Sequence, residues 1–252
     1  MADDTTAELV ADLAAEQDAL VGLLEAIAAD DWFRPTPSWS WDVRDTVAHL
    51  ADTDELAADT CTDGPRALAT VAAACPSSED LTLLGVLRGR RRPGVEVLEW
   101  WKRAQRAERA VLLDLDPATR VPWGLGMRPP SFVTARLMET WAHSLDVHAA
   151  LGITPVDTDR LRHVAWIGIR ALPYAASVAG VAPPAGPIRV DLTLPSGATW
   201  SSGPDDAPAR IAGPASEFCR VFVQRIRLRD ASKLAATGAD ADLALRVARS
   251  YL

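Results

Sequence analysis

The sequence predicts a mainly α-helical protein with a small α+β domain at its carboxyl end. Apolar residues recur at helical spacing through most of the first 180 residues, and a segment rich in Pro follows at 181–187. After that segment, apolar and polar residues alternate, as they do in half-buried strands. We therefore expect two domains, a helical bundle over residues 1–180 and a small α+β domain over residues 181–252.

The first two helices are predicted from their apolar spacing and their capping residues. Residues 5–29 carry leucines at helical spacing after a threonine-rich start with capping chemistry. The prolines in 35–38 interrupt this helix. A second helix is expected to begin after Ser40 or Asp42, either of which can cap it, and to run to about Asp59.

Three more helices complete the predicted helical domain. They are expected over residues 94–113, 131–151 and 157–179. Ser131 is the expected cap of the middle one, Gly152 its stop, and Pro173 a kink in the last. Residues 61–80 are interpreted as an elaborated connection, because Gly and Pro surround a short alanine-rich run. The first four of these five helices are amphipathic and joined by modest loops, which is typical of a four-helix bundle, and the fifth is expected to lead out of the bundle.

The carboxyl-terminal domain is predicted from alternating apolar residues and turn signals. Strands are expected over residues 188–194, 198–201 and 209–212, and helices over residues 214–227 and 239–251. The Pro-Ser-Gly turn between the first two strands favours a hairpin.

Charge and composition exclude several classes of protein. The net charge of −8 argues against a nucleic-acid binder, whose affinity depends on basic patches. No run of eighteen apolar residues predicts a membrane span, and the amino terminus lacks the pattern of a signal peptide, so we expect a cytoplasmic protein. Acids crowd residues 1–60 and arginines dominate 88–136, which we interpret as complementary faces of packed helices.

Two segments about ninety residues apart supply a set of candidate metal ligands. Glu139 and His143 are four residues apart on a predicted helix and therefore share one face, and His49 lies on another helix. Imidazole nitrogen and carboxylate oxygen suit a divalent metal such as zinc, and three protein ligands leave a position open for water or substrate. The alternative is a surface ion pair between Glu139 and His143.

Other residues near these segments are candidates for supporting roles. Asp146 can be a fourth ligand or can hold a ligand imidazole through its free ring nitrogen, whereas His148 lies off the ligand face. Arg136 can orient Glu139 or can pair with an acid of the first helix. Three tryptophans are candidates for the wall of a pocket or for core packing: Trp41, Trp123 and Trp141.

The two segments resemble a known family. Residues 39–50, Trp-Ser-Trp-Asp-Val-Arg-Asp-Thr-Val-Ala-His-Leu, resemble the second-helix signature of the DinB/YfiT-like metal-binding bundles. Residues 136–146, Arg-Leu-Met-Glu-Thr-Trp-Ala-His-Ser-Leu-Asp, resemble the actinobacterial branch that contains the mycothiol-dependent maleylpyruvate isomerases. The resemblance covers nearly the whole chain and implies a DinB-like four-helix bundle followed by a sterol-carrier-like α/β domain.

The resemblance also implies site residues and cofactors. It assigns His49, Glu139 and His143 as ligands of a divalent metal, zinc in the first place and nickel or ferrous iron as alternatives. Water, substrate or a thiol such as mycothiol would take the remaining positions. The isomerases also use an arginine of the second domain that faces the metal, and Arg225 is the preferred match over Arg227.

The expected function is that of a metal-dependent enzyme acting on a small molecule, with a thiol-dependent isomerase or S-transferase first. The alternatives are a thiol-independent isomerase, cyclase or lyase of secondary metabolism, and a non-catalytic small-molecule binding protein. A homodimer is one expected assembly. Ser144 follows His143 where the isomerase motif often has a second histidine, which argues for a substrate other than maleylpyruvate.

Overall fold

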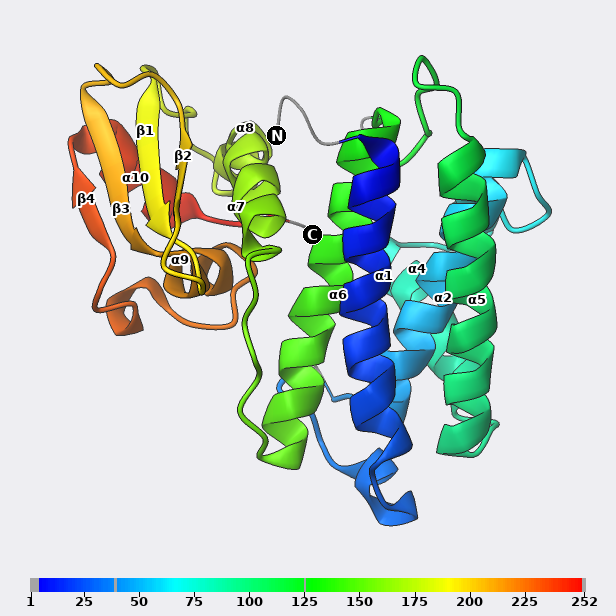
Figure 1. Ribbon diagram of the computed structural model, residues 1–252. Helices are drawn as coiled ribbons and strands as arrows, with labels where there is room; N and C mark the ends of the chain where they lie inside the picture. Colours follow the sequence, from blue (N-terminus) through cyan, green and yellow to red (C-terminus); the bar gives the residue numbers. More distant parts are fainter. Residues whose placement is uncertain (1–4, 39, 125, 251–252) are drawn as a thin grey trace. The chain divides into compact units, whose positions relative to one another are not determined.

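The computed structural model describes residues 5–38, 40–124 and 126–250, and it divides the chain into two compact units (Figure 1). The first unit comprises residues 2–155 and is helical, and the second comprises residues 156–252 and contains the sheet. This confirms the mainly α class with a small α+β part. The division lies before the expected boundary at 180/181, because the helices after residue 156 pack against helices of the second unit.

Four long helices form the bundle of the first unit (Figure 1). They are α1 (Thr6–Glu25), α2 (Val43–Thr62), α5 (Gly94–Asp114) and α6 (Pro129–Leu151). Both α1 and α2 pack against α5 and against α6, so each helix has two neighbours around a shared interior. Leucines, valines and tryptophans of all four helices fill that interior.

The first two helices begin at the caps that the sequence predicts. Thr5 forms a capping box with Glu8 at the start of α1, and the Asp42 carboxylate accepts a hydrogen bond from the Asp45 amide at the start of α2. The helix α1 ends earlier than expected, at Glu25, and a 3₁₀ helix, η1 (Ala29–Phe33), follows it. Asp42, rather than Ser40, is therefore the cap of α2.

The interpretation of residues 61–80 as a connection misses two helices, α3 (Leu68–Ala72) and α4 (Ser78–Gly89). The Ser77 side chain caps α4, which packs closely against α2. A Cβ at Gly85 would lie 2.5 Å from Asp52 Cβ, and one at Gly89 would lie 2.2 Å from Ala48 Cβ. These glycines permit the close approach of the two helices, whereas their low helix propensity hides α4 in the sequence.

The start of α6 differs from the prediction, although its end does not. Arg128 is the residue before the helix, and two prolines follow it in the first turn, where the missing amide protons cost nothing. Ser131 therefore lies inside the helix and does not cap it. Gly152 ends the helix as expected, with a φ of 68° that an L side chain rarely adopts.

The amino end of α5 depends on a glycine that lies against a buried tryptophan. A Cβ at Gly94 would lie 2.1 Å from Trp32 Cδ2, and Trp32 is itself buried in the hydrophobic core. We expect Gly94→Ala to lower the free energy of unfolding by about 1–3 kcal/mol, because the ring or the helix must move. Urea denaturation measures this, with Gly22→Ala as the control, since a Cβ at Gly22 meets nothing within 4 Å. Equal unfolding midpoints for both variants would contradict the prediction.

The second unit combines helices with a four-stranded sheet of order β2-β1-β3-β4. Its helices are α7 (Leu161–Arg170), α8 (Leu172–Val178), α9 (Ala215–Phe222), the 3₁₀ helix η2 (Leu228–Asp230) and α10 (Ala239–Val247). Its strands are β1 (Ile188–Thr193), β2 (Thr199–Ser202), β3 (Ala209–Pro214) and β4 (Ala235–Thr237). The predicted hairpin pairs β1 with β2, whereas β3 runs parallel to β1 with Val190 opposite Ile211.

Three details of this unit differ from the sequence prediction. The fifth helix is divided into α7 and α8 near Pro173, so the expected kink is a break. The helix expected over 214–227 ends at Phe222, and β4 is an additional short strand. The expected end of the last helix at Tyr251 lies outside the described residues, within which α10 ends at Val247.

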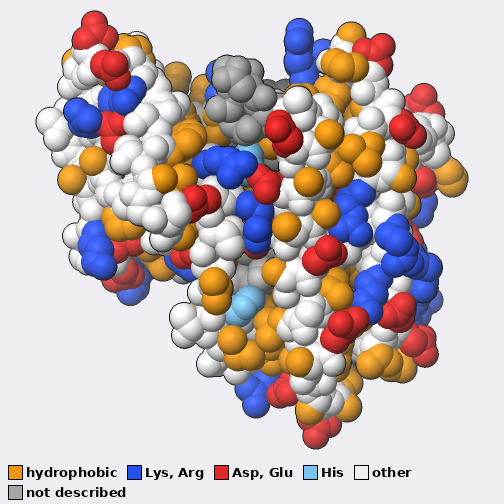
Figure 2. Space-filling model, in the orientation of Figure 1, with side chains coloured by type: hydrophobic (Ala, Val, Ile, Leu, Met, Phe, Trp, Pro, Cys, Tyr) orange, Lys and Arg blue, Asp and Glu red, His pale blue; other side chains and the backbone are white. Residues whose placement is uncertain are grey.

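The charge pattern is explained by ion pairs between the helices of the first unit. Over α1 and α5, basic and acidic side chains lie next to one another (Figure 2), and Lys102 and Arg109 of α5 pair with Glu25 and Asp18 of α1. On the other side of the bundle, Arg90 pairs with the buried Asp45 of α2. None of the helices in the described part of the chain is long and apolar enough to cross a membrane.

Candidate metal centre

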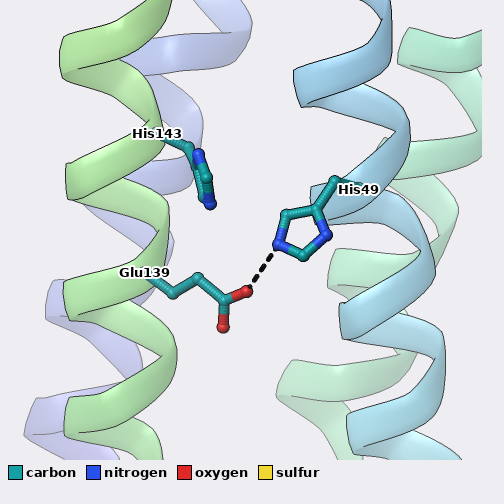
Figure 3. A group of neighbouring side chains, drawn as sticks. All are labelled: His49, Glu139 and His143. Atoms are coloured by element: carbon teal, nitrogen blue, oxygen red, sulfur yellow. Dashed lines mark hydrogen bonds and ion pairs between the residues drawn. The ribbon is translucent and has the colours of Figure 1, made fainter. Parts of the chain in front are cut away.

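The structure brings His49, Glu139 and His143 together inside the bundle. His49 comes from α2, and Glu139 and His143 come from successive turns of α6 (Figure 3). One potential ligand atom from each residue lies within 4.8 Å of the other two. The His49 Nε2 and Glu139 Oε1 atoms are 3.0 Å apart, and the two imidazole centroids are 4.9 Å apart. Two histidines and a carboxylate thus converge on one small volume.

This donor set fits a divalent cation. Zinc binds imidazole nitrogen and carboxylate oxygen at about 2.0–2.2 Å, which separates the ligand atoms of a tetrahedral site by about 3.4 Å. The three atoms already lie near that spacing, within 4.8 Å of one another. Both histidines are only 8% exposed, so the imidazole donors lie in a setting from which water is largely excluded.

Asp146 contacts the ring of His143, and Ser38 in turn contacts Asp146. The His143 Nδ1 atom is 3.0 Å from Asp146 Oδ2, and the Ser38 hydroxyl donates to the same oxygen at 2.6 Å. An aspartate in this place accepts a hydrogen bond from Nδ1–H and leaves Nε2 for a metal. Of the two predicted roles of Asp146, this geometry matches the holding of an imidazole. Sequence reasoning did not select Ser38, which lies in the loop before α2.

Of the three candidate tryptophans, Trp41 borders both imidazoles, and Trp123 lies 5.7 Å from the guanidinium carbon of Arg136. The Trp41 ring lies 5.1 Å from the His49 ring and 6.1 Å from the His143 ring, between centroids. Trp141 is buried on α6, and Trp123 lies against Phe132 at 5.4 Å. Trp41 is buried as well, so it shields the two imidazoles from water.

Arg136 is the cationic partner of Glu139. Its Nη1 donates to Glu139 Oε2 from one turn earlier on α6. Burial alone would raise the pKa of Glu139, but Arg136 and then His49 and His143 outweigh it and hold that pKa well below its usual range. Glu139 is therefore an ionised carboxylate, as a metal ligand must be.

Arg136 also belongs to a group of buried polar residues that is linked to the metal centre through Glu139, and we call this group the buried polar core. It consists of Gln17 of α1, Asp54 of α2, Trp101 and Glu108 of α5, and Arg136 of α6. The acids that pair with Arg136 are Asp54, Glu108 and Glu139, so the predicted pairing with an acid of the first helix is wrong. The first helix contributes the amide of Gln17 instead, which donates to Glu108 at 3.1 Å.

The buried polar core has a signal in the sequence that our reasoning missed. Asp54 continues the apolar stripe of Val43, Val47 and Leu50 at helical spacing. An acid in such a position faces the interior, where an unpaired charge is costly, and so it requires a partner. The same holds for Glu108, which follows Trp101 by seven residues.

Glu108 is expected to make the stability of the metal-free protein depend on pH. Burial and then the charge of Asp54 raise the pKa of Glu108 from 4.5 to about 8. A raised carboxyl pKa favours the folded state below its ordinary value, and this contribution is lost as the pH rises through about 8. We therefore expect Glu108→Gln to flatten the fall in unfolding free energy between about pH 5 and pH 8. Urea denaturation across that range measures it.

The control for this prediction is Glu96→Gln, which changes an exposed glutamate on the same helix. That variant should keep the pH dependence of the wild type. Parallel curves for the wild type and Glu108→Gln would contradict the assignment of the titration to Glu108.

Three other candidate positions, Arg225, Arg227 and His148, have contacts within their own parts of the chain. Arg225 follows α9 in the second unit, where its Nη1 donates to the Val223 carbonyl at 2.9 Å. Arg227 pairs with Asp230, and neither arginine is on a helix as the prediction had it. His148 interacts with Ser144 of its own helix and is not one of the three converging residues.

Comparison with known proteins places the chain in a family. Residues 13–148 match the model of the mycothiol maleylpyruvate isomerase N-terminal domain, which is more than half of the chain. Two uncharacterized proteins of Mycobacterium tuberculosis, from strains CDC 1551 and H37Rv, are each 39% identical over 248 residues, covering 96% of this chain and 94% of theirs.

Solved structures agree on the fold. Crystal structures of the mycothiol-dependent maleylpyruvate isomerase and of a histidine-to-alanine mutant each match with a TM-score of 0.61 at 12% identity. Each match covers 93% of both chains. The converging residues His49, Glu139 and His143 all lie within the matched segment 13–148. The chain therefore belongs to the mycothiol maleylpyruvate isomerase N-terminal domain family.

Proposed function

We propose that the protein is a thiol-dependent isomerase that acts on a small molecule at a divalent metal ion. The observation that carries this proposal is the convergence of His49, Glu139 and His143 within 4.8 Å inside the domain that matches the isomerase family. These three residues would hold the ion. Zinc is the preferred metal, because it accepts this mixture of imidazole and carboxylate ligands and keeps a position open in enzymes.

A bound divalent ion would supply Lewis acidity, which polarises a substrate oxygen and lowers the pKa of a coordinated thiol or water. Three residues of the chain, Glu139, Asp146 and Trp41, would support the binding and the chemistry of this ion. Glu139 is ionised and offers negative charge, and Asp146 fixes the tautomer of His143 so that Nε2 remains available. Trp41 lies over both imidazoles and limits the access of water to that side.

The remaining components of the proposal come from the family. Mycothiol is the proposed thiol cofactor, because the family and the similar crystal structures are named for it. Arg225 is the proposed residue of the second unit that binds a substrate carboxylate, for which the planar guanidinium is well shaped. The proposed substrate is a small anionic or carbonyl-containing molecule.

The decisive experiment replaces the metal with cobalt and adds the thiol. The visible spectrum of the cobalt protein should change when mycothiol is added, because a thiolate would enter the coordination sphere. Isomerisation of maleylpyruvate and related unsaturated keto acids is then assayed with and without mycothiol. An unchanged spectrum with activity that does not need the thiol would contradict the thiol-dependent proposal. An unchanged spectrum without activity would favour a binding protein.

A further inference from the structure

Glu139 presents its two carboxylate oxygens to different partners. Oε1 lies 3.0 Å from His49 Nε2, on the side where the three donor atoms converge, and Figure 3 shows the other oxygen directed away from His49. That other oxygen, Oε2, accepts from Arg136 Nη1. The carboxylate therefore has one oxygen toward the candidate metal position and one toward a guanidinium.

The guanidinium of Arg136 is itself fixed by contacts to several helices. Arg136 is 1% exposed. Its Nε donates to Glu108 Oε1 of α5 at 2.9 Å, and its Nη2 donates to Thr53 Oγ1 of α2 at 3.0 Å and to Asp54 of the same helix. Two of the three guanidinium nitrogens are thus engaged, and the contact to Glu139 uses the third, Nη1.

The anchors of Arg136 are held in turn by the buried polar core. The Trp101 indole donates to Asp54 Oδ2 at 2.9 Å, and the Gln17 amide donates to Glu108 Oε2 at 3.1 Å. Both acids are fully buried. Charge-assisted hydrogen bonds in such a low-dielectric setting are strong and directional, so Arg136 has little freedom to release Glu139.

We propose that Arg136 is a positioning residue of the metal centre. Held by Asp54 and Glu108, it retains Oε2 of Glu139 and leaves Oε1 as the single carboxylate donor. This inference rests on the proposed metal site and adds the binding mode of its acidic ligand. One oxygen and two imidazole nitrogens leave more of the coordination sphere to substrate and thiol than a ligand set with a bidentate carboxylate would.

A crystal structure of the wild-type protein loaded with zinc tests the inference without any substitution. We expect Oε1 at about 2.0–2.2 Å from zinc and Oε2 still hydrogen-bonded to Arg136. Zinc bonded to both oxygens would overturn the inference and leave the metal site intact. Zinc bound elsewhere, or not bound to His49, Glu139 and His143, would overturn the proposed metal site instead.

Cobalt spectra of two matched variants provide a second test in solution. The parent carries Asp54→Asn and Glu108→Gln, which keep hydrogen-bond acceptors beside Arg136 but remove two buried charges. The second variant adds Arg136→Met, so no pair of unpartnered buried acids is created. We expect weaker visible absorption of bound cobalt only after Arg136→Met, because Glu139 then binds through both oxygens and raises the coordination number.

The control for these spectra is Thr140→Val, which changes a buried residue next to Glu139. Within the described structure its hydroxyl has no hydrogen-bond partner, so the substitution alters the same turn of α6 without touching Arg136. Its cobalt spectrum should equal that of the wild type. Equal spectra for the parent and the Arg136→Met variant would overturn the positioning role.

Discussion

Replacement of His143 by alanine is expected to lower the affinity of the protein for zinc by at least about 100-fold, while the protein stays folded. Outer-shell partners of a metal ligand already account for about 10–100-fold in affinity, and His143 is proposed as a ligand itself. The buried apolar residues Trp141, Ala142 and Leu145 lie beside His143 on α6, and the substitution leaves their packing in place. Competition with a chromophoric chelator measures the affinity, and circular dichroism measures the fold.

His148→Ala is the matched control, because His148 lies on the same helix and bonds to Ser144 rather than to the converging residues. That variant should bind zinc as the wild type does. A His143→Ala protein with wild-type affinity would exclude the three residues as the metal site. The result would also remove the basis of the proposed isomerase chemistry, since that chemistry depends on the ion.

The ligand set was accessible from the sequence because it depends on one short-range rule and one family signature. Glu139 and His143 must share a face if residues 138–146 are helical, and that helix is predicted well by its apolar spacing. The association with His49 needs the packing of α2 beside α6, which spacing alone does not give. The resemblance to the isomerase branch supplied that pairing, and the structure places the three residues together.

The features that were missed depend on contacts between distant segments. The helix α4 contains glycines that allow it to pack closely against α2. The spacing of residues within α4 does not predict that contact. Asp54 and Glu108 are acids on apolar stripes, and their partner is an arginine on a third helix. Patterns of single helices predict which face is buried, but they do not predict which charges meet there.

Arg136→Met is expected to lower the free energy of unfolding by about 3–5 kcal/mol, the cost of removing one partner from a buried ion pair. Arg136 is the cation that pairs with both Asp54 and Glu108, and all three are at most 1% exposed at their side chains. Burial already raises the pKa of both acids, and removal of the guanidinium removes a charge that opposes this rise. Urea denaturation of the metal-free protein measures the loss.

Two further measurements test whether buried acids without a partner cause this loss of stability. Acids with raised pKa values favour the folded state at low pH and oppose it as the pH rises, so Arg136→Met should cost more at pH 8 than at pH 5. When Asp54→Asn and Glu108→Gln are added to Arg136→Met, most of the lost stability should return, because no buried charge of this pair is left without a partner. A loss below about 1 kcal/mol for Arg136→Met alone, an ordinary effect for a substitution, would mean that water or another group satisfies the two acids.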